Sequence, residues 1–262
     1  MKKRIILGDP HGNYKIIESI YKNERPDMVI ILGDYCDSFV HGTPEIVAAY
    51  KKMRKLQNKH VKTYGDGSFI TLLGNHDWHY IMFGERYSGF HQSTWNAMHD
   101  MLDSDMTDGR LPIVWVDNRN KTIYSHAGLT NTWMSDWRIP SPEFVNEVND
   151  SGLNFSHMSF EPHGNSKWQG PLWVRPMALI SDLYGRGEWK QIVGHTRTNN
   201  GKPVCIGLHG DNVWQTYKED AVVFVMDTLP FYYMRETLDD EGNLVNRELV
   251  NNMEFDPANL PQ

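Results

Sequence analysis

Cysteine is scarce in this chain, and long apolar runs are missing. Cys36 and Cys205 are the only cysteines among 262 residues, which is too few for a disulfide framework and is typical of a reducing compartment. No apolar stretch approaches the roughly 18 residues that a membrane helix needs. The basic residues 2–4 lead into a short apolar run that does not resemble the core of a signal peptide. We therefore expect a cytoplasmic protein with no membrane partner.

Basic residues are also in deficit. The chain has 26 Lys and Arg against 33 Asp and Glu, which gives a formal net charge of -7. Nonspecific binding of nucleic acid relies on a basic face that neutralises phosphates, so this balance disfavours nucleic acid as a partner without excluding it. Histidine and tryptophan are plentiful instead, with 12 and 9 residues, and this supply suits a metal site with aromatic walls.

The order of expected elements indicates an α/β protein. Apolar runs alternate with helical patterns over the first third of the chain, which predicts parallel strands joined by crossover helices. The Gly-, Pro- and Trp-rich stretch 151–176 is irregular enough to be a lid or binding loop. We expect one domain over residues 1–240 that includes this lid, and a loosely attached polar tail over 241–262. Helices are predicted at 14–23, 43–56 and 93–102, and strands at 4–7, 28–32, 69–73, 112–116, 121–125, 191–193, 203–206, 221–226 and 231–234.

Five short runs at the ends of expected strands carry Asp, His or Asn. Polar residues that directly follow a strand lie at the carboxyl edge of a sheet, which is where open α/β folds bind ligands. Five such strand ends with side chains of one chemical class are hard to obtain by chance. The runs are Gly8-Asp9-Pro10-His11-Gly12, Gly33-Asp34-Tyr35-Cys36-Asp37, Gly74-Asn75-His76-Asp77, Ser125-His126-Ala127-Gly128 and Gly194-His195-Thr196.

The side chains of these runs suit a pair of first-row metal ions. Asp9 and His11 stand two residues apart, so both can face the same way in an extended loop. A carboxylate oxygen with a neutral imidazole suits Mn, with Fe, Zn or Ni as alternatives. Asp34 can bridge two ions about 3.5–4 Å apart through its two oxygens. The residues expected to complete the second metal site are Asn75, His126 and His195.

His76 is the candidate general acid. It follows Asn75 directly, so it points away from the metals if Asn75 points toward them. Asp37 is available to hold His76 protonated, and His76 could then donate a proton to a leaving alkoxide.

In this order, the motifs Asp9-x-His11, Gly33-Asp34-x-x-Asp37, Gly74-Asn75-His76-Asp77, His126-Ala127-Gly128 and Gly194-His195 resemble those of the calcineurin-like metallophosphoesterase superfamily, from residue 5 to about 228. Many members carry a second metal-binding His two residues after the last Gly-His pair, where this chain has Arg197. The single His is more similar to the phosphoprotein phosphatase branch and its bacterial and phage relatives. Asp227-Thr228 also resembles an Asp-Thr-Gly sequence near the end of that branch.

The resemblance implies a four-layer α/β/β/α sandwich with mixed central sheets. It implies that Asp34 is shared by the two metal ions and that His76 and Asp37 form the acid pair. The branch usually has Arg directly after the second Asp of Gly-Asp-x-x-Asp, whereas this chain has Ser38, so one phosphate contact is missing. Arg175 lies where a second phosphate-binding Arg is expected, and Arg197 is an alternative. By this resemblance the first metal is held by Asp9, His11 and Asp34, and the second by Asp34, Asn75, His126 and His195.

The predicted reaction is hydrolysis of a phosphomonoester by water that two divalent metal ions activate. Phosphoserine and phosphothreonine in proteins belong to this substrate class, as do small phosphoesters. Three alternatives stay open: a dinucleoside polyphosphate hydrolase, a phosphodiesterase acting on nucleotides or nucleic acid, and a catalytically silent binding scaffold. Taken singly, each motif is also compatible with ordinary turns and caps, and histidines such as His157 and His163 are more typical of packing or surface positions.

Overall fold

Two mixed β-sheets form the centre of the protein. The computed structural model describes residues 1–38, 40–82, 88–147, 165–198, 201–208, 213–214 and 218–252. The first sheet has the strand order β11-β10-β1-β2-β3, and the second has the order β4-β5-β6-β9-β7-β8. In the first sheet β1, β2 and β3 are parallel, and in the second β5, β6 and β9 are parallel. The strands are β1 Lys2–Leu7, β2 Met28–Ile31, β3 Phe69–Thr71, β4 Val114–Asp117, β5 Thr122–Ser125, β6 Lys190–Val193, β7 Val204–Gly207, β8 Val213–Trp214, β9 Ala221–Val225, β10 Tyr232–Leu238 and β11 Leu244–Asn251.

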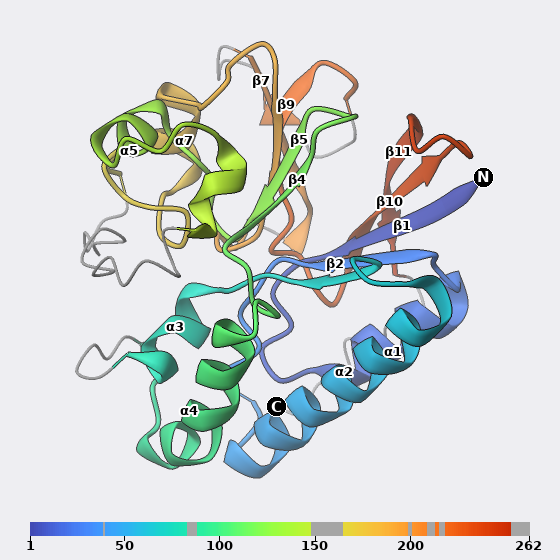
Figure 1. The fold of residues 1–262 in the computed structure, drawn as a ribbon, viewed down its shortest axis with the longest axis vertical. Coiled ribbons are helices and arrows are strands. Elements are labelled where there is room, and N and C mark those ends of the chain that lie inside the picture. Colours follow the sequence, from blue (N-terminus) through green and yellow to red (C-terminus); the bar gives the residue numbers. More distant parts are fainter. Residues whose placement is uncertain are drawn as a thin grey trace.

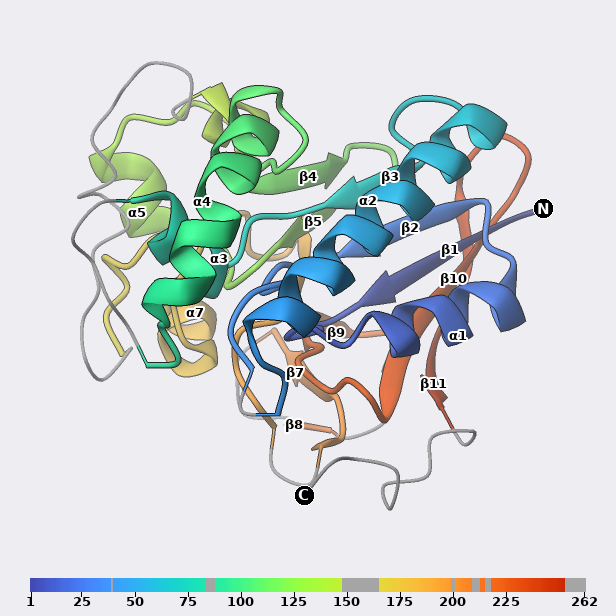
Figure 2. The same ribbon diagram turned by 90° about the horizontal axis from the view of Figure 1, so that it is seen from below.

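Helices cover the outer faces of both sheets. Helices α1 and α2 lie across β1, β2 and β3 (Figures 1 and 2). In α1 the buried residues Ile16, Ile17 and Ile20 recur at helical spacing, which makes one face of the helix apolar. On the second sheet, Leu179 of α7 packs in a cluster with Val223 of β9. The helices are α1 Tyr14–Glu24, α2 Thr43–Tyr64, α3 Asn75–Ile81, α4 Gln92–Thr107, α5 Asn131–Asp136 and α7 Pro176–Ser181, with a 3₁₀ turn at Pro142–Val145.

The two sheets pack face to face through an apolar layer. Ile6 and Ile30 of the first sheet, with Leu72 directly after β3, are fully buried in one cluster with Tyr124 and Ile192 of the second. Alternate residues of the same strands face the helices on the other side, because successive side chains of a strand point to opposite faces. The sequence-based prediction of an α/β/β/α sandwich with mixed sheets is therefore confirmed.

A charged cluster is also buried between the sheets. Arg4 Nη1 of β1 lies 2.9 Å from Asp117 Oδ2 of β4, and Tyr124 Oη donates to Glu236 Oε2 at 2.9 Å. Arg247 Nε of β11 donates to Glu236 Oε1 at 2.6 Å, and both of these side chains are almost completely buried. A buried carboxylate is tolerated only when it is paired and hydrogen-bonded, so this cluster fixes how β10 and β11 sit on the second sheet.

Residues 244–251 correct one of the sequence-based predictions. The tail expected at 241–262 contains β11, which pairs with β10 in antiparallel register, as Glu236 opposite Arg247 illustrates. Half of the eight residues of β11 are polar, and the buried Arg247 is neutralised by Glu236, which is 11 positions away. Of the expected lid, residues 151–164 lie outside the described residues, together with His157 and His163. None of the described helices is long and apolar enough to cross a membrane.

Candidate metal centre

The loops that follow β1, β2, β3, β5 and β6 meet at the carboxyl ends of the parallel strands. Glycine is required at two positions where one of these loops packs against another. A Cβ atom on Gly74 would lie 2.1 Å from Asp34 Oδ1, and one on Gly194 would lie 2.1 Å from Asp9 Oδ1. These glycines allow backbone from one loop to lie against a carboxylate from another. The structure thereby brings together residues that are up to 186 positions apart.

Site residues adopt backbone conformations that side chains disfavour. The φ angles of His11, Asp34, Asp37 and His195 are 43°, 57°, 55° and 60°. The left-handed region costs an ordinary residue about 1–2 kcal/mol. Such strain persists only where the surroundings fix the backbone, and it is concentrated at functional sites in proteins.

Asp77 supplies that restraint for the loop after β2. Its carboxylate, which is fully buried, accepts hydrogen bonds from the backbone N–H groups of Asp34 (2.8 Å), Tyr35 (2.8 Å), Cys36 (3.0 Å) and Gly74 (3.1 Å). One side chain therefore holds the loops after β2 and β3 in register. The motif Gly74-Asn75-His76-Asp77 contains this residue, but its role as a loop anchor depends on contacts across about 40 residues of sequence.

Each of the three candidate histidine ligands has one ring nitrogen fixed by a backbone carbonyl. A carbonyl oxygen can only accept, so the bonded nitrogen carries the hydrogen and the other nitrogen is free to bind a metal. Burial lowers the pKa of His126, and lowers the pKa of His195 strongly, so both rings are neutral. The acceptors are Asp37 O for His11 Nδ1 (2.9 Å), Leu32 O for His126 Nδ1 (2.9 Å) and Trp173 O for His195 Nε2 (3.2 Å).

The free ring nitrogens converge on oxygen atoms. His126 Nε2 lies 2.7 Å from Asn75 Oδ1 and 3.5 Å from Asp34 Oδ2. His195 Nδ1 lies 2.9 Å from the same amide oxygen, and His11 Nε2 lies 3.9 Å from Asp34 Oδ2. Nitrogen lone pairs that face carboxylate and carboxamide oxygens form the donor set of a first-row metal ion.

Asp9 has an oxygen that its surroundings leave unsatisfied. Asp9 Oδ2 accepts from the backbone N–H of His195 at 2.8 Å, whereas Asp9 Oδ1 is buried and has no hydrogen-bond partner among the described residues. Burial and the charges of Asp227 and Asp34 raise the pKa of Asp9 well above its usual range. A divalent cation would satisfy the oxygen and relieve the repulsion, so the residues present fit a metal pair. Ligand atoms of Asp9, Asp34 and His126 already lie within 4.8 Å of one another.

His76 lies beside this centre and is tied to Asp37. Its Nδ1 is 2.7 Å from Asp37 Oδ2, and its ring centroid is 5.4 Å from that of His11. Asp37 also accepts from Tyr80 Oη, and His79 Nε2 lies 2.7 Å from Asp37 Oδ2. Burial would lower the pKa of His76, but Asp34 and Asp37 outweigh it and raise that pKa to about 9. The ring is therefore protonated at neutral pH.

His79 and Tyr80 were not singled out from the sequence. The spacing of His76 and His79 on helix α3 was the available signal, because residues three apart share a helix face. The sequence motif Asp227-Thr228 gave no role to Asp227, which the structure places near this centre. It is almost fully buried and acts electrostatically on Asp9, which follows β1 in the neighbouring sheet.

Arg175 reaches the edge of the centre. Its Nη1 donates to His195 O and to Thr196 Oγ1, both at 3.2 Å, and the charges of Asp227, Asp34 and Asp9 act on it. Its guanidinium retains further N–H groups beyond these two contacts. The structure thus places Arg175 beside His195, one of the predicted metal ligands.

Ser38, by contrast, has a structural use. Its Oγ accepts from the backbone N–H groups of Val40 (3.2 Å) and His41 (3.0 Å), which closes a tight turn. An Arg at this position would lose both hydrogen bonds. The substitution Ser38→Arg therefore changes the loop as well as the charge.

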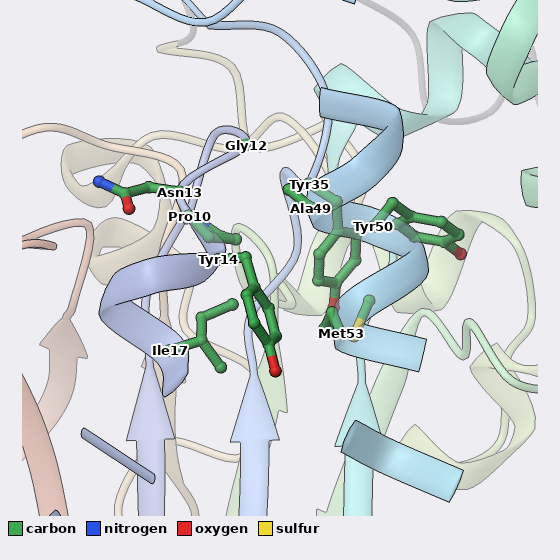
Figure 3. Close-up of a pocket in the computed structure, with 9 residues that line it drawn as sticks. All are labelled: Pro10, Gly12, Asn13, Tyr14, Ile17, Tyr35, Ala49, Tyr50 and Met53. Atoms are coloured by element: carbon green, nitrogen blue, oxygen red, sulfur yellow. The ribbon is translucent and has the colours of Figure 1, made fainter. Parts of the chain in front are cut away.

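Two hollows flank the loop after β1. A small one of about 200 Å³ lies between α1 and α2, where Tyr14, Ile17 and Tyr35 point into it (Figure 3). It is walled by packing residues and contains none of the predicted ligands. The other, of about 590 Å³, opens to solvent directly over Asp9 and His11. This second hollow is the one that adjoins the metal centre.

A family model described as calcineurin-like phosphoesterase matches residues 2–253. The chain belongs to this family. A solved structure described as a cold-active protein tyrosine phosphatase is similar to this calcineurin-like phosphoesterase with a TM-score of 0.60 and 17% identity, over 95% of this chain and 78% of that one. At that identity the similarity shows a shared fold alone.

Curated relatives of this calcineurin-like phosphoesterase share part of its length. It is 27% identical over 139 residues to a symmetrical bis(5'-nucleosyl)-tetraphosphatase of Erwinia tasmaniensis, across 49% of this chain and 45% of that protein. It is 25% identical over 187 residues to a protein of the same description from Baumannia cicadellinicola, across 67% of this chain and 59% of that protein. The chain therefore spans about half the length of the curated relatives it matches.

Proposed function

We propose that the chain is a metal-dependent phosphoesterase that hydrolyses a phosphomonoester, with phosphoserine and phosphothreonine included in the substrate class. One observation carries this proposal. Three histidines, each fixed by a backbone carbonyl, present their free nitrogens to the oxygens of Asp34 and Asn75, beside an unsatisfied oxygen of Asp9. This donor set suits a pair of divalent cations, and membership of the family supports the same conclusion.

Two divalent ions would be held by the six predicted ligands, and Mn²⁺ is the proposed metal. Bound there, they would activate water for attack and neutralise the charge of the phosphate. Imidazole and carboxamide ligands suit Mn²⁺, Fe²⁺ or Zn²⁺ better than Mg²⁺, which prefers oxygen ligands and keeps its waters. The proposed ligands are Asp9, His11, Asp34, Asn75, His126 and His195.

His76 provides the proton that the leaving oxygen needs. As water attacks phosphorus and the bond from phosphorus to the ester oxygen breaks, that oxygen becomes an alkoxide. The hydrogen on His76 Nδ1 is bound to Asp37, so Nε2 is the nitrogen that donates. Asp37 keeps the ring oriented and charged, and Tyr80 in turn fixes Asp37.

Arg175 supplies charge-assisted hydrogen bonds to the phosphate. It projects from the segment before α7 toward the same edge as His195, and its remaining N–H groups can bind phosphate oxygens. These contacts strengthen as the phosphoryl oxygens gain negative charge in the transition state, so Arg175 contributes to kcat as well as to binding.

Removal and restoration of metal tests the proposal. The protein, stripped by a chelator and dialysed, should lose hydrolysis of a monoester such as p-nitrophenyl phosphate. It should regain activity with Mn²⁺ more readily than with Mg²⁺. A panel with a phosphopeptide, a diester and a dinucleoside tetraphosphate, measured in parallel, then ranks the substrates. Full activity after thorough chelation would contradict the metal centre.

A second candidate is hydrolysis of dinucleoside polyphosphates. The specific observation in its favour is that both curated relatives described above are symmetrical bis(5'-nucleosyl)-tetraphosphatases. The same metal ligands serve either reaction, and only the surroundings of the phosphate differ. In the panel, a kcat/KM for the tetraphosphate far above that for every monoester would favour this candidate.

A further inference from the structure

A lysine-rich hollow of about 880 Å³ lies between helices α1 and α2, and we call it the α1–α2 groove. It is lined on α1 by Tyr14, Glu18, Tyr21 and Lys22, and on α2 by Lys52, Lys55, Leu56 and Lys59. These residues recur at helical spacing, so each helix contributes one face to the groove. None of them is a predicted metal ligand or a member of the acid pair, so the proposed reaction does not use the groove.

The groove starts beside the metal centre. Helix α1 begins at Tyr14, three residues after the predicted ligand His11. Tyr14 also lines the small hollow of Figure 3, together with Pro10 and Gly12, which flank His11. From Tyr14 to Lys22 the helix rises about 12 Å, so the groove extends along α1, beside α2 (Figure 2). A chain that occupies the groove can therefore continue to the metals.

The charge of the groove is opposite to that of the whole chain. Four lysines line it against one glutamate, whereas the chain has a net charge of -7. Lys22 Nζ lies 3.1 Å from Glu18 Oε1, so these two charges offset each other. Lys52, Lys55 and Lys59 are exposed and form no ion pair with the described residues. Three ammonium groups along about 10 Å of one helix suit a ligand with several negative charges.

The groove also has an apolar surface. Tyr14, Tyr21 and Leu56 are half-buried and pack against the hydrophobic core. Tyr21 Oη lies 2.9 Å from His60 Nδ1, and this hydrogen bond fixes its ring. A peptide can place an apolar side chain on this surface and acidic side chains beside the lysines. A nucleic acid is charged at every phosphate, which Glu18 would repel, and the described residues that line the groove include no arginine, the side chain best suited to phosphates.

We propose that the α1–α2 groove docks an acidic segment of a protein, and that this protein is the phosphorylated substrate of the metal centre. The second part rests on the proposed function, because a phosphoserine or phosphothreonine of the same protein must bind at the metals. From His11 to Tyr14 and along α1 the path is roughly 20 Å, which an extended peptide covers with about six residues. The acidic residues should therefore lie about that far from the phosphorylated residue.

Phosphopeptides with and without acidic residues test this docking. Each contains one phosphoserine and, about six residues away, a block of glutamates with one leucine, and the matched peptide has glutamine in place of glutamate. The block is placed on either side of the phosphoserine in separate peptides, so that both directions of binding are sampled. In one direction, the Mn²⁺-loaded protein should show a kcat/KM about tenfold higher for the acidic peptide, because three exposed ion pairs act together. The difference should lie in KM and should diminish in high salt, which screens exposed charges.

Two triple variants with the same change of charge separate the groove from the net charge. The first replaces the groove lysines of α2 by Lys52→Gln, Lys55→Gln and Lys59→Gln. The control replaces exposed lysines of the same two helices that do not line the groove, by Lys15→Gln, Lys51→Gln and Lys62→Gln. The first variant should lose most of the preference for the acidic peptide, and the control should keep it. Equal losses in the two variants would overturn the docking groove.

Fluorescence anisotropy with a labelled acidic peptide that lacks the phosphate measures docking without catalysis. We expect binding to the wild type and to the control variant, and loss of binding in the first variant. This pattern without hydrolysis of any phosphopeptide would support the groove and contradict the proposed function. Equal kcat/KM for all phosphopeptides, without binding of the labelled peptide, would overturn the groove and leave the proposed function intact. A single-stranded oligonucleotide that binds more tightly than the peptide, and loses affinity in the first variant, would assign the groove to nucleic acid and overturn the proposal.

Discussion

His76 and His79 lie on the same face of α3 and approach the same oxygen of Asp37, yet only His76 borders the metal centre. The ring of His79 is fully buried, whereas the side chain of His76 is 23% exposed. A residue that protonates a leaving group must reach it, so the difference in exposure supports our proposal that His76 is the acid and that His79 supports Asp37.

Replacing His76 tests this assignment. His76→Asn should reduce kcat about 10²-fold or more, the usual scale for loss of a general acid. The content of bound metal should stay near that of the wild type, because His76 is not among the proposed ligands. Steady-state kinetics and elemental analysis of the same preparation provide the two measurements. His91→Asn, an exposed histidine, is the matched control, and loss of metal from His76→Asn would make His76 a ligand instead.

Arg175 yields a second prediction at this scale. Arg175→Ala should raise KM and lower kcat for a monoester, because the contact strengthens as the phosphate gains charge. Arg175→Lys should recover only part of the loss, since an ammonium group lacks the planar fork of the guanidinium. The test is kcat and KM of both variants with one monoester. Wild-type kinetics in Arg175→Ala would mean that its bonds to His195 and Thr196 are merely structural.

At the scale of elements, a buried charged cluster joins the hairpin β10–β11 to β1 and, through hydrogen bonds of Tyr124 and Thr122, to the second sheet. Glu236 accepts from Arg247, Tyr124 and Arg4, and it is completely buried. Sequence patterns failed here because these partners are separated by 11, 112 and 232 positions. A strand with an arginine on its interior face has the composition of a surface tail. Only the contact with Glu236 shows that Arg247 is buried.

Glu236→Gln should therefore destabilise the protein. Removing one partner of a buried ionic cluster leaves uncompensated charge and costs about 3–5 kcal/mol. The free energy of unfolding from urea titrations measures the loss. Glu248→Gln on the same hairpin is the control, because its pair with Arg235 is partly exposed and such pairs contribute about 1 kcal/mol or less. Equal losses in the two variants would contradict a special role for the buried cluster.

The same carboxylate predicts how stability depends on pH. Burial would raise the pKa of Glu236, but Arg247 and Arg4 outweigh it and hold that pKa below its usual range. A carboxyl with a depressed pKa stabilises the fold above the pKa of the unfolded chain, which is about 4.3 for Glu. That contribution is lost as pH falls through the folded pKa. Unfolding titrations between pH 7 and pH 3 should show a shallower acid decline for Glu236→Gln than for the wild type, and identical slopes would exclude this contribution.

At the scale of the whole molecule, the sequence predicted the sandwich. The six residues that we propose as metal ligands lie near one another in the structure, because each follows a strand with a clear apolar pattern. The carboxyl ends of parallel strands share one sheet edge, so local patterns determined a global site. Contacts between loops followed no local pattern. Asp77 and Asp227 act on residues of other loops, which the sequence does not place beside them. From the sequence, Ser38 was interpreted only as a missing phosphate contact, because the turn that it closes is visible only in the structure.

Metal should act on the stability of the entire fold, because the centre joins loops from both sheets. Mn²⁺ at 100 times its dissociation constant should add about 2.7 kcal/mol to the free energy of unfolding by mass action. For a chain of this size each kcal/mol raises the Tm by roughly 2–4 °C, so calorimetry should show a rise of about 5–10 °C. If the Tm of the wild type does not change with Mn²⁺, the metal does not bind preferentially to the folded chain, and the proposed metal centre is contradicted.

Asp9→Asn tests separately how far Asp9 destabilises the metal-free fold and how far it contributes to metal binding. In the metal-free protein the carboxylates of Asp9, Asp34 and Asp227 repel one another within a buried volume. An amide at position 9 can still accept the hydrogen bond from His195 N, so the substitution removes charge and keeps that contact. We expect the metal-free variant to be more stable than the metal-free wild type by about 0.5–2 kcal/mol, as for other residues kept for function. It should also lose most of the Mn²⁺-dependent rise in Tm. A misfolded variant would be less stable both with and without metal, so misfolding cannot produce a gain in metal-free stability together with a loss of the Mn²⁺-dependent rise in Tm. If the metal-free variant is less stable than the metal-free wild type, Asp9 stabilises the loops by packing and does not destabilise them by charge.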